Sequence, residues 1–158
     1  MNKKAVIKTK EGFVLIEFSE KGLVSLKLPC KKKPKFFPVS KDKQQEIVKR
    51  LKKDLNQYFD GKKIDFDYPL DLSGNSGFCF KVWKALRNVH YGRTKSYKWL
   101  ARKAGDKNCC RAAGNALGKN PLPVIIPCHR IIQSNGKPGG FSSGLNWKKR
   151  LLDLERGV

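Results

Sequence analysis

The chain has 158 residues, of which 39% are hydrophobic, and its formal net charge is +22. This length and composition suit one compact domain or two small lobes with a core, and they exclude a disordered chain. No run approaches the ~18 consecutive apolar residues that span a membrane, and the start, MNKKAVIKTKEGF, lacks the apolar stretch of a secretory signal.

The first part of the chain predicts a small sheet and one helix. Residues 4–28 are β-rich runs separated by glycine-containing turn signals. A basic, proline-broken connector follows at 30–40, where a solvated loop is favoured over a phosphate contact or a targeting tag. Ser40 is predicted to cap a helix that ends at Gly61, and 63–72 is an extended piece or a loop. The apolar residues at helical spacing are Ile47, Val48, Leu51, Leu55, Tyr58 and Phe59.

The second part, from about residue 73, predicts a helical lobe. The stretch SGFCFKVWKALRNVHYG places Phe80, Trp83, Leu86 and Val89 on one helical face, with Cys79 as a packing residue among them. We therefore expect an α/β (α+β) protein with two lobes, residues 1–72 and residues 73–158.

Two short helices with a tight joint come next. The first is predicted to start at a Ser96 cap and to stop at Gly105, and the second to start at an Asn108 cap and to stop at Gly118. Their spacing fits a helix-turn-helix. A last helix is expected over about 145–156.

The second short helix has an unusually small face. Arg111 is followed by Ala112, Ala113, Gly114 and Asn115, although a glycine inside a helix costs roughly 1 kcal/mol relative to alanine. Tight helix packing is one explanation. The favoured one is a helix pressed into a DNA groove, with Arg111 reaching inward.

The charge distribution also points to nucleic acid. Residues 71–158 contain 17 basic and 4 acidic residues, and between Asp71 and Asp153 the only acid is Asp106. A domain that excludes acids over such a length is expected to face a polyanion. A lysine-rich surface kept for solubility or heat tolerance is the alternative.

The cysteines indicate a reducing compartment. Five cysteines at irregular spacings exclude an even disulfide framework, so we expect a cytoplasmic location. No C-x2-C pair exists, and the histidines are His90 and His129, so we expect neither a metal nor another cofactor.

The stretch PLPVIIPCHRII places a thiol beside a potential base in an apolar run. Cys128 and His129 would point to opposite faces of a strand, but Pro121, Pro123 and Pro127 favour a rigid turn, and a water could bridge the two groups. An inert core thiol is the alternative. A histidine base needs an orienting carboxylate, and the last helix is its obvious source.

This stretch closely resembles the active-site signature of the O6-alkylguanine-DNA alkyltransferases, also called methylated-DNA–protein-cysteine methyltransferases. The blocks FKVWKAL, YGRTKSYKWLA, RAAGNALGKNP and GGFSSGLNWKKRLLDLE resemble the family's blocks in the same order, over about residues 78–157. The first lobe carries no signature of its own and is compatible with the family's ribonuclease-H-like sheet lobe.

The resemblance implies a function and its catalytic residues. Cys128 would accept the alkyl group of O6-alkylguanine, mainly O6-methylguanine, irreversibly and once per molecule. His129 would act on the thiol through a water, Glu155 would orient that histidine, and Asn120 would pin the turn. Tyr97 would help to rotate the base out of the duplex and could protonate the leaving guanine.

The resemblance also implies a DNA-binding surface and a pocket. Double-stranded DNA would be bound through its minor groove by a monomer, and cooperative binding stays open. Arg130 would be structural, bracing the lobe interface. The DNA-binding residues would be Ser96, Tyr97, Arg111, Ala112, Ala113, Gly114 and Asn115. The alkyl pocket would contain Pro123, Phe141, Ser142 and Ser143.

Four features depart from the family's pattern. His90 stands where proline is common, Phe141 where tyrosine is common and Ser143 where glycine is common, so the pocket loses a hydroxyl and narrows. The first lobe has only Cys30 and no histidine, so we expect none of the zinc that some members hold there.

Two rival functions remain at this point. One is a non-catalytic module that binds alkylated DNA and recruits other repair; the presence of Cys128 argues against it. The other is a cysteine hydrolase that uses Cys128, His129 and Glu155, which would leave the basic surface and the helix pair unexplained.

Overall fold

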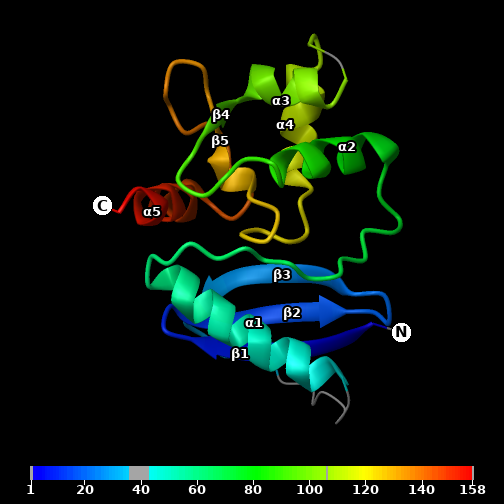
Figure 1. The fold of residues 1–158 in the computed structure, drawn as a ribbon, viewed down its shortest axis with the longest axis vertical. Coiled ribbons are helices and arrows are strands. Elements are labelled where there is room, and N and C mark those ends of the chain that lie inside the picture. Colours follow the sequence, from blue (N-terminus) through cyan, green and yellow to red (C-terminus); the bar gives the residue numbers. More distant parts are fainter. Residues whose placement is uncertain (1, 36–42, 106, 158) are drawn as a thin grey trace. The chain divides into compact units, whose positions relative to one another are not determined.

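The computed structural model describes residues 2–35, 43–105 and 107–157. They form two compact units, Met1–Asp71 and Leu72–Val158 (Figure 1). An antiparallel sheet in the first unit and a mostly helical second unit confirm the predicted α+β class.

The first unit is built on a three-stranded antiparallel sheet in the order β1-β2-β3. The strands are β1 (Lys3–Thr9), β2 (Gly12–Phe18) and β3 (Leu23–Cys30), so the strands predicted for this part of the chain are present. Alternate residues point to one buried face, as the two-residue period of a strand requires. Ala5 pairs with Ile16 on that face, and both are buried.

Helix α1 (Lys43–Phe59) packs against β1 and completes the core of this unit (Figure 1). Its apolar residues recur at helical spacing, and Leu51, Leu55 and Tyr58 are fully buried. The chain leaves the helix through Gly61, which has φ 82, a conformation that favours glycine. The predicted cap, Ser40, lies outside the described residues.

A close backbone contact joins the segment after α1 to the start of β3. The amide of Leu23 donates to the carbonyl of Pro69 at 2.9 Å, and the amide of Asp71 donates to the carbonyl of Leu23 at 2.8 Å. Gly22 has φ 153, and a Cβ atom there would lie 2.3 Å from the Pro69 oxygen. Only glycine therefore fits at this crossing.

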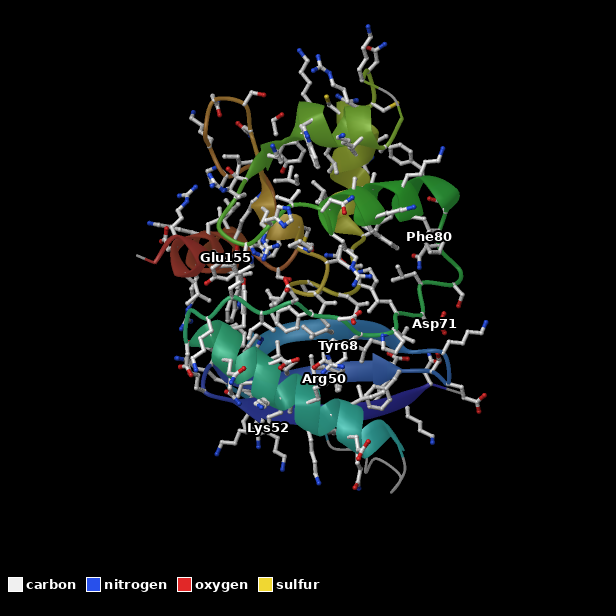
Figure 2. All side chains as sticks on the ribbon, in the orientation of Figure 1. Arg50, Lys52, Tyr68, Asp71, Phe80 and Glu155 are labelled. Carbon is white, nitrogen blue, oxygen red and sulfur yellow. The ribbon has the colours of Figure 1, made fainter. Side chains whose placement is uncertain are left out.

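The second unit begins with helix α2 (Gly77–Leu86), whose first turn is capped by the side chain of Ser76. Phe80 was predicted to lie on the same helical face as Trp83 and Leu86, and this prediction was wrong. The residue is 42% exposed and is not part of the buried face of α2 (Figure 2). The buried face is rotated away from it, so Phe80 only meets the edge of Trp83, with ring centroids 6.3 Å apart. The buried residues of α2 are Cys79, Val82, Trp83, Ala85 and Leu86.

Helices α3 (Tyr97–Lys103) and α4 (Cys110–Gly118) pack against each other in the order expected of a helix-turn-helix. The Ser96 hydroxyl accepts a hydrogen bond from the backbone of the first turn of α3, as predicted. The predicted Asn108 cap was wrong. Cys109 occupies the N-cap position and makes no side-chain capping bond, because α4 begins later than the Asn108 signal implies.

The remaining elements surround the Cys128 segment. Strands β4 (Lys95–Ser96) and β5 (Ile131–Ile132) form a short parallel pair. The 3-10 turn η1 (Cys128–Arg130) precedes β5, and helix α5 (Leu145–Arg156) ends at the left-handed Gly157. Within the described ranges, no helix combines the length and apolar character needed to cross a membrane.

Candidate active site

The turn that carries Cys128 is held by one amide side chain. Nδ2 of Asn120 donates to the carbonyl of Ile126 at 2.8 Å, and Oδ1 of Asn120 accepts from the amide of Leu122 at 2.9 Å. Between them, Val124 has φ 74, which a β-branched residue rarely adopts. Such strain persists where the surroundings fix the backbone, so the thiol of Cys128 sits on a rigid turn.

The backbone of η1 changes the relation between the adjacent Cys128 and His129. On a strand the two side chains would leave opposite faces, whereas on a 3-10 turn they leave at roughly 120° to each other. Both residues are buried, with 5% and 0% exposure. The thiol and the imidazole can therefore share one enclosed region.

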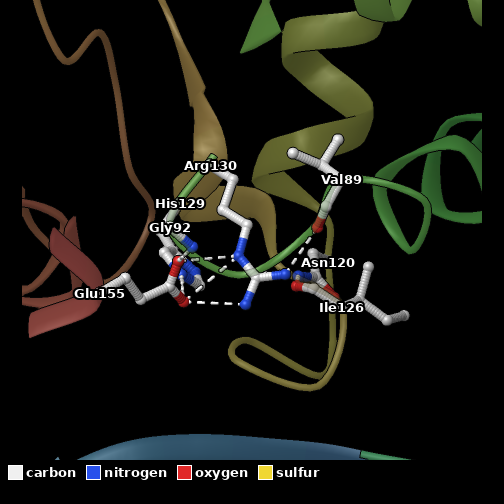
Figure 3. Close-up of polar contacts among 7 residues, drawn as sticks. All are labelled: Val89, Gly92, Asn120, Ile126, His129, Arg130 and Glu155. Carbon is white, nitrogen blue, oxygen red and sulfur yellow. Dashed lines mark hydrogen bonds and ion pairs between the residues drawn. The ribbon is translucent and has the colours of Figure 1, made fainter. Parts of the chain in front are cut away.

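Glu155 is the centre of a buried polar network (Figure 3). Its Oε1 lies 2.7 Å from Nε2 of His129, and its Oε2 accepts from the amide of Gly92 at 3.1 Å. The guanidinium of Arg130 donates to the same carboxylate through Nε at 2.9 Å and Nη2 at 2.9 Å. Nη1 of Arg130 donates to the carbonyl of Val89 at 2.6 Å. The arginine thus braces this unit from within.

The network fixes the charges of its members. Burial would raise the pKa of Glu155, but hydrogen bonds from His129 and Arg130 hold this pKa well below its usual range. The pKa of His129 is lowered, first by burial and further by the charges of Arg130 and Lys148, against the effect of Glu155. At neutral pH this gives a carboxylate and a neutral imidazole. Nε2–H of the imidazole then donates to Glu155, which leaves the lone pair on Nδ1; the tautomer is inferred from this bond.

Opposing effects act on the pKa of the Cys128 thiol. Burial raises the pKa of Cys128. A hydrogen bond from Asn120, the positive charge of Lys148 and the backbone amides of Cys128 and His129 act in the other direction and lower this pKa. The resting thiol is therefore protonated, and the groups that surround it stabilise the thiolate when it forms.

A cavity of about 300 Å³ opens beside the thiol. Its walls come from α3, α4, η1 and the loop before α5, and its volume lies at the lower end of the ~300–1,000 Å³ typical of small-molecule sites. Of the expected pocket residues, Phe141 and Ser142 line it, while Pro123 and Ser143 are not among the described lining residues. The lining consists of Tyr97, Gly114, Leu117, Gly118, Cys128, Gly140, Phe141 and Ser142.

Gly139 makes room for Tyr97 in this cavity. A Cβ atom on Gly139, which has φ 73, would lie 2.6 Å from the Tyr97 hydroxyl, whereas one on Gly114 would lie 3.8 Å from the ring, an ordinary van der Waals contact. Burial raises the pKa of Tyr97, against a hydrogen bond from the backbone of Gly140. The hydroxyl is therefore a protonated donor held against the loop that carries Gly139 and Gly140.

The residues of the small stretch of α4 do not all face the same way. Arg111 and Asn115 are exposed, and Ala112 and Gly114 are partly exposed, so these four residues are accessible to solvent. Ala113 contradicts the expected DNA contact, because it is fully buried and packs inside the unit. Helix packing therefore explains Ala113, whereas the DNA contact of the accessible positions stays a prediction.

Lys148 belongs to the site, and the sequence reasoning missed it. This lysine is 1% exposed, and its Nζ donates to the carbonyl of Gly140 at 3.1 Å. Its charge lowers the pKa of both Cys128 and His129. The available signal was its spacing: Lys148 shares a helix face with the buried Leu151, Leu152 and Glu155, so it had to point inward.

Comparison with known families accounts for both units. Residues 77–157 match the model of the 6-O-methylguanine DNA methyltransferase DNA-binding domain. Residues 2–72 match the ribonuclease-like domain of the same family, although this half carries no recognisable motif of its own. The resemblance inferred from the second half is therefore confirmed, and it extends over the first half.

Individual relatives agree with the family models. The methylated-DNA–protein-cysteine methyltransferase of Methanosarcina barkeri is 39% identical over 95% of this chain and 94% of its own length. That of Methanosarcina acetivorans is 36% identical over 96% of both chains. The crystal structure of Mycobacterium tuberculosis OGT in complex with DNA superposes with a TM-score of 0.82 at 34% identity, covering 98% of this chain and 93% of that one. This chain belongs to the 6-O-methylguanine DNA methyltransferase family.

Proposed function

We propose that this protein repairs DNA by direct reversal of damage. It binds double-stranded DNA through the minor groove, rotates an O6-alkylguanine, mainly O6-methylguanine, out of the duplex and transfers the alkyl group to Cys128. The thioether that forms has no leaving group for water, so each molecule reacts once. The proposal is supported by the family, whose named members are methylated-DNA–protein-cysteine methyltransferases, and by a relative solved in complex with DNA.

The observation that carries the proposal is the position of one thiol. Cys128 lines a cavity, and the next residue on the same turn, His129, lies 2.7 Å from the carboxylate of Glu155 on α5. A thiol needs a base or a positive charge to become a nucleophile, and both are provided here. A structural cysteine in a core would require neither.

The reaction can be written with the chain's own groups. His129 accepts the thiol proton at Nδ1, through a water, while Glu155 holds the imidazole in the required tautomer. The sulfur of Cys128 then attacks the alkyl carbon in line, forming the S–C bond as the C–O6 bond breaks. The electron pair remains on guanine, which takes up a proton from the Tyr97 hydroxyl, and the thiol proton replaces it by way of His129. The products are S-alkyl-Cys128 and guanine.

Base extrusion is assigned to the outward side chains of the helix pair. Arg111 is exposed at the start of α4, where it can fill the place that the rotated base leaves in the stack. Tyr97 lies in the wall of the cavity. An alkylated base pairs poorly, so its extrusion costs less than the few kcal/mol needed for a normal base.

Transfer stoichiometry is the direct test. The protein is titrated with duplex DNA that contains one labelled O6-methylguanine, beside a Cys128→Ser control. We expect one label per protein, on the peptide that contains Cys128, and none in the control. Binding without transfer would instead indicate a damage-recognition module, and repeated turnover of an ester or amide would indicate a hydrolase.

Two substitutions separate extrusion from chemistry. Tyr97→Ala and Arg111→Ala should slow repair of duplex DNA far more than reaction with free O6-benzylguanine, because the free base needs no extrusion. Equal losses on both substrates would remove the extrusion roles from these residues.

We further propose a cytoplasmic monomer. The five cysteines form no disulfide with one another in the structure, which accords with a reducing compartment. Sedimentation with and without duplex DNA tests the monomeric state and would reveal cooperative assembly on DNA.

A further inference from the structure

Lys148 is a buried cation beside the acceptor thiol. It projects from α5 and is 1% exposed, although burying an ammonium group is unfavourable unless its surroundings compensate. Among the described residues, its Nζ makes no ion pair with a carboxylate. Its contacts are instead the carbonyl of Gly140, at 3.1 Å, and the face of the Tyr97 ring, whose centroid lies 5.7 Å from Nζ.

These contacts join three parts of the cavity. Gly140 and Tyr97 both line it, one from the loop before α5 and the other from α3. The backbone of Gly140 also interacts with the Tyr97 hydroxyl. The ammonium group therefore contacts two walls of the cavity whose third wall is Cys128.

The other titratable groups around Lys148 explain why its charge matters. Tyr97 faces it from α3, Cys128 and His129 from η1, and behind them lies Glu155, which is neutralised by Arg130. Burial lowers the pKa of Lys148 to about 8, and Cys128 is the group that raises it. The carboxylate is occupied by its own partners, so the negative charge that Lys148 can compensate is a thiolate.

We propose that Lys148 is a positioning residue of the transfer site, whose ammonium charge stabilises the Cys128 thiolate and whose hydrogen bond to Gly140 fixes the cavity wall. It performs no covalent step and donates no proton to the product. Its role is complementary to that of His129, which removes the thiol proton, whereas Lys148 stabilises the charge that remains on sulfur. This inference rests on the proposed role of Cys128 as the acceptor.

The test follows the thiol itself and does not depend on DNA. Alkylation of Cys128 by iodoacetamide is measured against pH by mass spectrometry of the peptide that contains it, for the natural protein and for Lys148→Arg, Lys148→Gln and Lys148→Met. Arginine keeps the charge, glutamine keeps only a donor for Gly140, and methionine keeps neither. Lys149→Met is the matched control, since Lys149 is the exposed neighbour on the same helix.

We expect the glutamine and methionine variants to react about tenfold more slowly at neutral pH, with their profiles displaced by about one unit to higher pH, because an opposite charge nearby lowers a pKa by ~1–3 units. Arginine should retain most of the rate, and the Lys149 control should not differ from the natural protein. Thermal unfolding identifies any variant that fails to fold, and glutamine, the closest neutral match, then decides.

An unchanged profile in the folded glutamine variant would overturn the electrostatic role. Binding and transfer then give an independent answer for the proposed function. If the displaced profile is found but labelled DNA transfers no alkyl group, the role of Lys148 stands and the proposed function fails. If labelled DNA transfers its alkyl group but the pH profile of the glutamine variant does not move, the proposed function stands and the role of Lys148 fails.

Discussion

The two units differ in whether their charged side chains are exposed or buried. Among the described residues of the first unit, the buried polar residue is Thr9 and the lysines are exposed. In the second unit, an imidazole, a guanidinium, an ammonium and a carboxylate are all buried within one site. The first unit is built from a sheet and a helix, whereas the second interrupts its helices with the strained turn at Val124.

This difference separates residues that stabilise from residues that act. Burial of apolar side chains in the first unit needs no polar partners. Each buried charge in the second unit needs partners with good geometry to offset its loss of hydration. Apolar residues could fill the same volume without that cost in free energy. A cluster of groups with shifted pKa values beside a cavity is typical of a functional site. Both units match the same family, and among the described residues the buried charged groups lie in the second.

Replacement of Glu155 should have the largest effect on stability. Glu155→Gln leaves the guanidinium of Arg130 buried without its counter-charge, so the free energy of unfolding should fall by about 3–5 kcal/mol. Asp54→Asn is the matched change in the first unit, where Asp54 contacts the Tyr68 hydroxyl and the more exposed Arg50. It should cost about 1 kcal/mol or less. Urea unfolding measures both, and similar losses would mean that the two carboxylates are equally replaceable.

The first unit should be most sensitive at a backbone contact. Gly22→Ala would place a methyl group 2.3 Å from the Pro69 carbonyl, which cannot move aside as a flexible side chain would. Overpacking of this kind costs about 1–3 kcal/mol. Gly77→Ala serves as the control, because nothing lies within 4 Å of a Cβ atom there. A fully stable Gly22→Ala protein would show that this crossing of the chain can relax.

Acid should destabilise the second unit through His129. Folding lowers the pKa of this histidine, so the unfolded chain binds a proton more readily, and the stability present above pH ~6.5 is lost as pH falls below it. The loss should approach about 1.4 kcal/mol per pH unit while the imidazole stays neutral in the folded state. This slope is measured from denaturant midpoints between about pH 7.5 and 5, because an unperturbed histidine changes its charge in this range. His129→Gln should remove it, whereas His90→Gln, at an exposed position, should not.

Loss of a helix cap should have the smallest effect on stability, and it separates that effect from an effect on the rate of transfer. Ser96→Ala and Ser76→Ala each remove the hydroxyl that caps a helix of the second unit, so each should cost about 1 kcal/mol of stability. Only Ser96 starts the helix that carries Tyr97, so only Ser96→Ala should also slow transfer from duplex DNA. Equal transfer rates in the two variants would mean that Tyr97 is positioned by other contacts.

Much of this molecule follows from local sequence rules. The strands of the first unit, the cap at Ser96 and the proline-braced turn before Cys128 each depend on neighbouring residues, and the structure contains all of them. A carboxylate of the last helix near His129 could be expected because the lobe has few carboxylates, and the choice of Glu155 came from the family resemblance. Its 2.7 Å contact, however, depends on how α5 packs, which no local rule describes.

Three side chains that the sequence did not place correctly share one physical cause. Phe80 has helical spacing, but it lies outside the buried face of α2 and stays exposed. Ala113 is small enough for a DNA groove, yet it is fully buried. The sequence did not single out Lys148, because composition alone cannot distinguish an ammonium in solvent from one enclosed beside a thiol. In each case tertiary packing decided which side of a helix is inside.

The burial of Cys128 has a consequence for the lifetime of the protein. A molecule that is used once, as proposed here, behaves as a reagent and not as a recyclable catalyst, so any stray electrophile that reaches its sulfur wastes it. With 5% exposure and a pKa raised by burial, the thiol is stored in its unreactive form. The same enclosure that makes ionisation difficult therefore preserves the supply of active protein until a matching lesion fills the cavity.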